Sequence, residues 1–257
     1  MNRWVVFRAV VGKTLVEMKR YLFNSISGLV TMYIVFLLLF FGARSLNLPF
    51  STGSGLEGLV VGYLVWMMSI IAYQDLAYTI ANEAEVGTLE QLFLSPTGFA
   101  WVGGSQMIGS FLTNLGMSSL VLLSMMLTSG QWLHLDVLSL LPLIPITLAA
   151  AYGLGFILAG LAVVFKRIQA LFQILTFGLV AFVAAPIAKY AWMKFLPLAM
   201  GNQLLRKVMV DGLRVWELPG QDLLVATGVG LGYLLFGVLV FNYCLKVARD
   251  RGMLGHY

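Results

Sequence analysis

Long apolar runs separated by short polar segments dominate this chain. A helix needs about 20 mostly apolar residues to cross the hydrocarbon core of a bilayer. Six runs reach that length and predict transmembrane helices over residues 22–43, 56–81, 102–129, 138–164, 168–188 and 221–246. The pattern predicts an all-α membrane protein with a single membrane domain over residues 1–257.

Two further segments are apolar but interrupted by charged residues. Residues 189–220 include Lys194, Pro197 and Arg206, and they predict a long loop with one or two short helices at the membrane interface. Residues 1–21 predict a helix lying on the membrane surface, because apolar side chains recur at helical spacing: Trp4, Phe7, Val11, Leu15 and Met18. A plain extension of the first span is the alternative for this segment.

The amino-acid composition agrees with a membrane protein. The chain is 60% hydrophobic and 11% charged, whereas a soluble domain has roughly 45–50% apolar and about 25% charged residues. The formal net charge of +5 does not indicate nucleic-acid binding. The basic residues lie at the ends of apolar runs, where lipid headgroups and membrane topology explain them.

The distribution of Lys and Arg predicts the orientation. Residues 1–21 carry five of them, and the first loop has only Arg44. Cytoplasmic loops are enriched in Lys and Arg, so the N-terminus is expected in the cytoplasm, and six spans return the C-terminus to the same side. The first run is too long for a signal-peptide core and its far end is a poor cleavage site, so it is expected to stay as a span.

Residues for catalysis or metal binding are sparse. Cys244 is the single cysteine, and His134 and His256 lie far apart, so no metal site and no intrachain disulfide are expected. Gly12-Lys13-Thr14 matches the end of a phosphate-binding loop, but Phe7 stands where that loop needs glycine. The chain is therefore not expected to bind ATP or to be an enzyme.

The loop between the second and third spans is unusual because residues 82–97 hold three glutamates and no Lys or Arg. The spacing predicts a short helix over residues 83–94 with an apolar face, ended by Ser95-Pro96. Anionic headgroups would repel this helix. We therefore expect its apolar face to dock into a groove on a cytoplasmic protein.

This loop resembles the signature of the ABC-2 type transporter permease family. The match consists of Glu83-x-Glu85-x-Gly87-Thr88-Leu89-Glu90, followed by Leu92 and Ser95-Pro96. The six spans, the basic N-terminal helix and Leu196-Pro197 before Arg206 in the 189–220 loop are similar to the family pattern. Ala84 stands where members often have a basic residue.

The resemblance implies a membrane subunit of an ATP-driven exporter. Two permease copies, or this chain and a close relative, would pair in the inner membrane of a prokaryote, and two cytoplasmic ATPase subunits would bind ATP and Mg²⁺. The segment 83–94 would be the coupling helix. The residues implied to contact the ATPase are Glu83, Glu85, Val86, Gly87, Thr88, Leu89, Glu90, Leu92, Phe93 and Pro96. The aromatic content favours hydrophobic or amphiphilic cargo, such as a drug, a lipid or a lipid-linked glycan.

A candidate transport path follows from side chains inside the first two spans. Asp75 lies within an apolar run, where a charge usually faces protein or water, and a structural hydrogen bond is its alternative role. Aromatic residues recur at helical spacing in both spans and are either path-lining or packing groups: Tyr33, Phe36, Phe40, Tyr63, Trp66 and Tyr73. The pairs Gly58/Gly62 and Gly228/Gly232 have the spacing that permits close helix contact.

Two other classes of function remain open. A secondary transporter or channel would need no ATPase, but such proteins usually carry several ionisable groups within the membrane. An intramembrane enzyme would need converging catalytic side chains, and Asp75 is nearly alone.

Overall fold

The computed structural model describes residues 3–20, 22–46, 54–85, 99–165 and 168–250. These ranges contain helices and no strand. The eight α-helices are α1 (Arg3–Arg20), α2 (Leu22–Ser45), α3 (Ser54–Glu85), α5 (Phe99–Ser129), α6 (Val137–Phe165), α7 (Gln169–Val183), α8 (Ala199–Met209) and α9 (Gly220–Asp250). Two short 3₁₀ helices, η1 (Ala191–Phe195) and η2 (Val215–Glu217), flank α8. The all-helical fold is confirmed.

Five of the described helices are long and apolar enough to cross a membrane, namely α2, α3, α5, α6 and α9. They coincide with the first four predicted spans and the last one. The chain is therefore a multi-pass membrane protein by helix length and hydropathy.

The fifth predicted span, over residues 168–188, was too long. Its helix α7 has 15 residues, which is a rise of about 22 Å against a hydrocarbon core of about 30 Å. Pro186 follows the end of α7, and a proline disfavours helical backbone geometry at the residue before it. The amide of Asn202, a residue of α8, donates to the Val183 carbonyl at 2.8 Å. The end of α7 therefore has a protein hydrogen-bond partner in place of a further helical turn.

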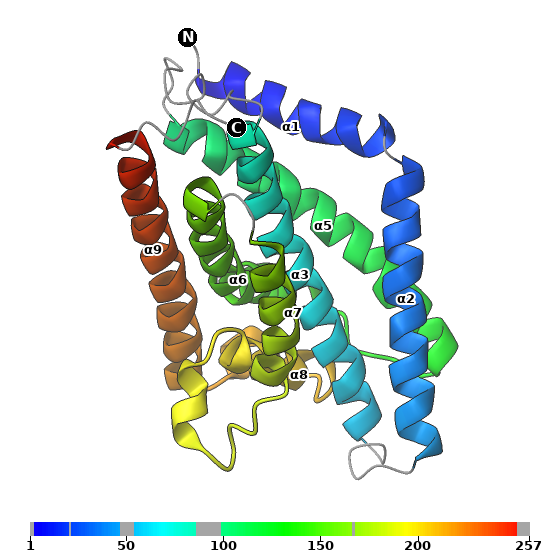
Figure 1. The fold of residues 1–257 in the computed structure, drawn as a ribbon. Coiled ribbons are helices and arrows are strands. Elements are labelled where there is room, and N and C mark those ends of the chain that lie inside the picture. Colours follow the sequence, from blue (N-terminus) through cyan, green and yellow to red (C-terminus); the bar gives the residue numbers. More distant parts are fainter. Residues whose placement is uncertain (1–2, 21, 47–53, 86–98, 166–167, 251–257) are drawn as a thin grey trace.

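The long helices form a bundle with α6 near its centre (Figure 1). α6 makes its most extensive contacts with α9 and α3. α1 lies across one end of the bundle, and the described end of α9 lies at that same end (Figure 1). We call this the α1 end, and the opposite end, where α8 lies, the α8 end.

The predicted N-terminal helix is confirmed as α1. It turns sharply away from α2 (Figure 1), so it is not a plain extension of the first span. α1 packs mainly along α5, and the Trp4 and Phe7 rings stack with centroids 5.4 Å apart. Part of this helix therefore rests on protein.

The segment 189–220 contains the short helices expected from its sequence, but α8 is more enclosed than an interfacial helix. Leu204, Leu205, Val208 and Met209 are buried, and α8 contacts α3, α6 and α9. α8 begins directly after Pro197 and Leu198, and Leu198 has a left-handed φ of 68°. This sharp turn directs α8 into the bundle.

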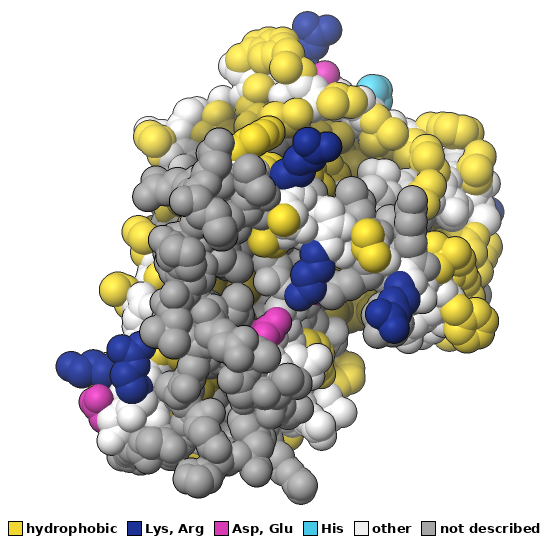
Figure 2. All heavy atoms as spheres, turned by 90° about the horizontal axis from the view of Figure 1, so that it is seen from above, with side chains coloured by type: hydrophobic (Ala, Val, Ile, Leu, Met, Phe, Trp, Pro, Cys, Tyr) yellow, Lys and Arg dark blue, Asp and Glu magenta, His cyan; other side chains and the backbone are white. Residues whose placement is uncertain are grey.

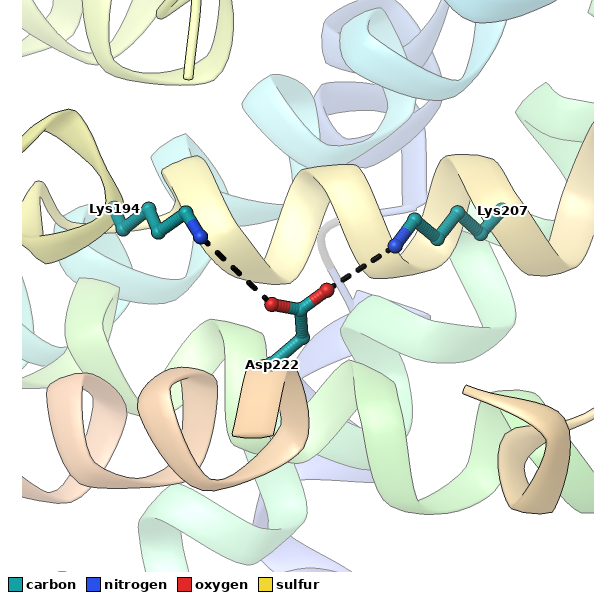
Figure 3. A network of polar contacts seen from close by, with 3 residues as sticks. All are labelled: Lys194, Lys207 and Asp222. Carbon is teal, nitrogen blue, oxygen red and sulfur yellow. Dashed lines mark hydrogen bonds and ion pairs between the residues drawn. The ribbon is translucent and has the colours of Figure 1, made fainter. Parts of the chain in front are cut away.

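One carboxylate connects three parts of the α8 end (Figure 3). Asp222 lies in the first turn of α9 and accepts a hydrogen bond from Lys207 of α8 at 3.1 Å. Its other oxygen lies 4.0 Å from the ammonium of Lys194 in η1. The carboxylate therefore holds η1 and α8 to the start of α9, where the helix dipole also favours a negative charge.

Glycine contacts define the packing of α6 against α9. A Cβ atom added at Gly237 would overlap the Gly153 carbonyl, and one at Gly230 would overlap the Ile146 carbonyl. Gly228 and Gly232 face open space, so the expectation of close contact at this pair is wrong within one chain. Gly58 does support close packing, because the Arg206 side chain lies directly against it.

Candidate functional site

The predicted ATPase-coupling segment begins in the last turn of α3. Glu83 and Glu85 belong to that helix. The remaining coupling residues lie outside the described residues: Val86, Gly87, Thr88, Leu89, Glu90, Leu92, Phe93 and Pro96. A coupling helix over residues 83–94 therefore stays a prediction.

An ion pair joins this end of α3 to α1. The Glu83 carboxylate lies 4.0 Å from the Lys13 ammonium, with side chains 25% and 58% exposed, respectively. Such exposed pairs contribute about 0–1 kcal/mol. Figure 2 looks onto this face and shows several separate Lys and Arg side chains on it. The end of α3 is therefore in electrostatic contact with α1, on a face that carries other cationic groups.

The candidate path aromatics of α2 and α3 pack against one another. Phe36 contacts Phe40 and Tyr63, and Tyr63 contacts Trp66, all with ring centroids 5.4 Å apart. Phe36 and Phe40 are fully buried, and Tyr33 is half-buried on α2. Tyr63 donates its hydroxyl hydrogen bond to the Met32 carbonyl. Within one chain these rings are packing groups between α2 and α3.

Trp66 also connects α3 to α7, as does Tyr73. Trp66 donates its indole hydrogen bond to the Thr176 carbonyl at 3.1 Å. Tyr73 donates to the Phe172 carbonyl at 3.1 Å and shares a hydrogen bond with the Thr176 hydroxyl at 2.5 Å. These hydrogen bonds give the polar atoms of Trp66 and Tyr73 partners on α7 at membrane depth, where an unpaired group is costly. Their role in a transport path stays a prediction.

Asp75 is exposed on the surface of α3. It lies ten residues before Glu85, the end of the helix, which corresponds to about 15 Å along the axis. The neighbouring Tyr78 is exposed and stacks on Phe172 of α7, with centroids 4.6 Å apart and ring planes 5° apart. Tyr78 therefore lies at the junction of α3 and α7, three residues after Asp75 in sequence.

Two polar side chains of α7 are also exposed. Gln169 and Gln173 are exposed and lie on either side of Phe172 in sequence. We call the polar residues Gln74, Asp75 and Tyr78 of α3 and Gln169 and Gln173 of α7 the α3–α7 polar strip; Gln74 is half-buried and the other four are exposed. The two glutamines were not among the predicted site residues, although their spacing of four in an apolar helix is a sequence signal.

Tyr152 of α6 is a further group that the sequence did not suggest. Its side chain is 3% exposed, and its hydroxyl has no hydrogen-bond partner. Asp75 is near enough to act on it electrostatically. An unpaired buried hydroxyl is a polar feature that ordinary packing does not explain.

No metal centre is evident in the part of the chain that the structure describes, since it holds no group of three or more His, Cys, Asp or Glu side chains suited to an ion. The candidate site therefore consists of the end of α3 with its ion pair to α1, and the α3–α7 polar strip. No protein-family model, curated protein or solved structure matches this chain.

Proposed function

We propose that this chain is the permease subunit of an ABC-type exporter that depends on a separate cytoplasmic ATPase. The observation that carries the proposal is the acidic-apolar segment 83–94, which starts in the last turn of α3 and has the residue pattern of an ABC-2 coupling helix. ATP and Mg²⁺ belong to the ATPase, and the permease performs no covalent chemistry.

Six crossings agree with the arrangement of the helices. In this proposal α7 makes the additional crossing, although its 15 residues are fewer than a span ordinarily needs, and its last residue accepts a hydrogen bond from Asn202 of α8. An even number of crossings leaves both termini on one side, and α1 and the end of α9 lie at the same end of the bundle (Figure 1). The Lys and Arg residues of α1 favour the cytoplasm for that end.

The α3–α7 polar strip supports pairing of two permeases. A carboxylate and two amides on apolar helices are unfavourable where they are exposed to hydrocarbon, so such groups face protein or water. A second copy placed against α3 and α7 would remove the strip from lipid and leave it between the two chains. The strip would then lie along the transport path, with Asp75 as its charged group.

Coupling in this proposal is mechanical. Closure of the paired ATPases would push the segment 83–94, and the movement would reach α3 directly and α1 through the Lys13–Glu83 pair. α3 carries part of the strip and contacts α7, which carries the rest. The cargo proposed is hydrophobic or amphiphilic, and the site is the inner membrane of a prokaryote.

The test is purification of the tagged chain from native membranes with identification of co-purifying ATPases. Leu89→Ala should release the ATPase or uncouple its ATP hydrolysis from transport. Leu46→Ala is the matched control, because Leu46 is an exposed leucine just after α2, at the other end of the bundle. Transport in vesicles driven by an ion gradient without ATP, and no bound ATPase, would overturn the proposal in favour of a secondary transporter.

A further inference from the structure

A long apolar groove separates α5 from α6. The two helices barely touch each other, although each packs on α3. The groove has a volume of about 520 Å³, with walls from α5 and α6, a floor from α3 and an end closed by Leu205 and Met209 of α8. Its rims at Leu112, Leu123 and Leu141 are exposed, so the groove opens sideways onto the surface of the bundle.

The few hydroxyl groups in the groove already have partners. Ser119 donates to the Leu115 carbonyl at 2.7 Å, and Thr147 donates to the Leu143 carbonyl at 2.8 Å. Ser118 donates to the Asn114 side chain at 3.0 Å. The groove therefore presents no unmet polar group to an occupant, and it favours a hydrocarbon over water or a polar solute.

The length of the groove matches one leaflet. Its lining runs from Phe111 to Leu123 on α5 and from Val137 to Leu148 on α6. At about 1.5 Å per residue this is about 18 Å, and one half of the hydrocarbon core is about 15 Å thick. The lined part of α6 begins at the helix start, so the groove lies in the half of the membrane at the α8 end.

The shape of the groove suits an extended occupant. A volume of about 520 Å³ spread over about 18 Å describes a narrow, elongated space. One extended hydrocarbon chain fits this shape, and a helix of a second protein packed over the open side of the groove is the other occupant to test.

We propose that the α5–α6 groove binds one acyl chain of a bilayer phospholipid from the leaflet at the α8 end. This inference rests on the membrane location of the chain and not on the proposed export function. The bound acyl chain would replace the packing contacts that α5 and α6 do not make with each other.

Photolabelling with a phospholipid that carries a diazirine on one acyl chain tests the proposal. The full chain is reconstituted in bilayers containing this lipid, irradiated and mapped by mass spectrometry. Labels should concentrate several-fold in residues 111–123 and 137–148 relative to Leu38 and Leu39, which are exposed apolar positions on α2. Equal labelling of α2 and the groove would overturn the proposal without the use of any variant.

Ser119→Trp should fill the groove and reduce its labelling several-fold. Ser124→Trp is the matched control, since Ser124 lies on α5 but does not line the groove, and it should leave the labelling unchanged. Equal labelling in the two variants would also overturn the proposal, as would cross-links from groove residues to a second protein chain in place of lipid.

Discussion

Replacing Gly237 by Ala tests whether the α6–α9 contact stabilises the bundle. The added methyl group would overlap the carbonyl oxygen of Gly153. This oxygen belongs to the backbone of α6 and cannot rotate away, so the two helices must separate locally. Overpacking of this kind costs about 1–3 kcal/mol.

Gly232→Ala is the control for this substitution. Gly232 lies on the same helix and faces open space, so its methyl group meets nothing. Both variants gain the same helix propensity, up to about 1 kcal/mol for Ala over Gly. The difference in unfolding free energy between the two variants therefore isolates the overpacking. At about 2–4 °C per kcal/mol for a protein of this size, Gly237→Ala should unfold about 2–12 °C below Gly232→Ala.

Cys244 supplies the assay. It is the single cysteine in the sequence and is buried, and its Sγ lies 3.3 Å from the position that a Cβ at Gly160 of α6 would occupy. A thiol-reactive fluorescent dye can label it only after α9 leaves α6. Fluorescence during heating thus reports the separation of these two helices. Equal transition temperatures for the two variants would refute the argument that the Gly153–Gly237 contact is tight.

Three further substitutions test other contacts. Asn202→Ala removes the donor to the Val183 carbonyl and should lower the unfolding free energy by about 1–3 kcal/mol. The same dye measures this change. An unchanged transition temperature would mean that the end of α7 does not need this hydrogen-bond partner. Asp222→Asn weakens both lysine contacts and should lower the unfolding free energy by about 1 kcal/mol. High salt should reduce the difference in unfolding free energy between variant and wild type. A difference that grows with salt would contradict an ionic origin. Asp75→Asn should reduce transport-stimulated ATP hydrolysis several-fold with little change in thermal stability, and unchanged turnover would remove Asp75 from the path.

The long spans could be predicted from the sequence because they depend on local composition. Residues 22–43 and 138–164, for example, are nearly reproduced by α2 and α6. The end of α7 could not be predicted in this way. The run 168–188 stays apolar after Val183, and the hydrogen bond that replaces the next turn comes from Asn202, a residue of another helix. Apolar composition sets where a helix can form, and tertiary partners set where it ends.

The glycine contacts and the candidate site show the same limit of prediction from sequence, namely that tertiary packing is not visible in it. Gly228 and Gly232 have the spacing of a contact pair, but the rotation of α9 turns Gly230 and Gly237 toward α6 instead. Asp75 was recognised because a charge in an apolar run is visible in the sequence. Gln169 and Gln173 of α7 were missed because their exposure depends on how α7 packs against α3.

The attachments of α7 bear on the proposed pairing of two permeases. α7 contacts α3 and, through its last turn, α8, while Ile174 and Phe177 on its surface are 67% and 74% exposed. The same helix exposes Gln169 and Gln173. Lipid can cover the two large apolar groups, but it solvates the glutamines poorly. A protein partner accounts for both the apolar and the polar groups, since it can pack on Phe177 and leave the glutamines in a hydrated path. The mixed surface of α7 therefore favours a second permease over lipid as its neighbour.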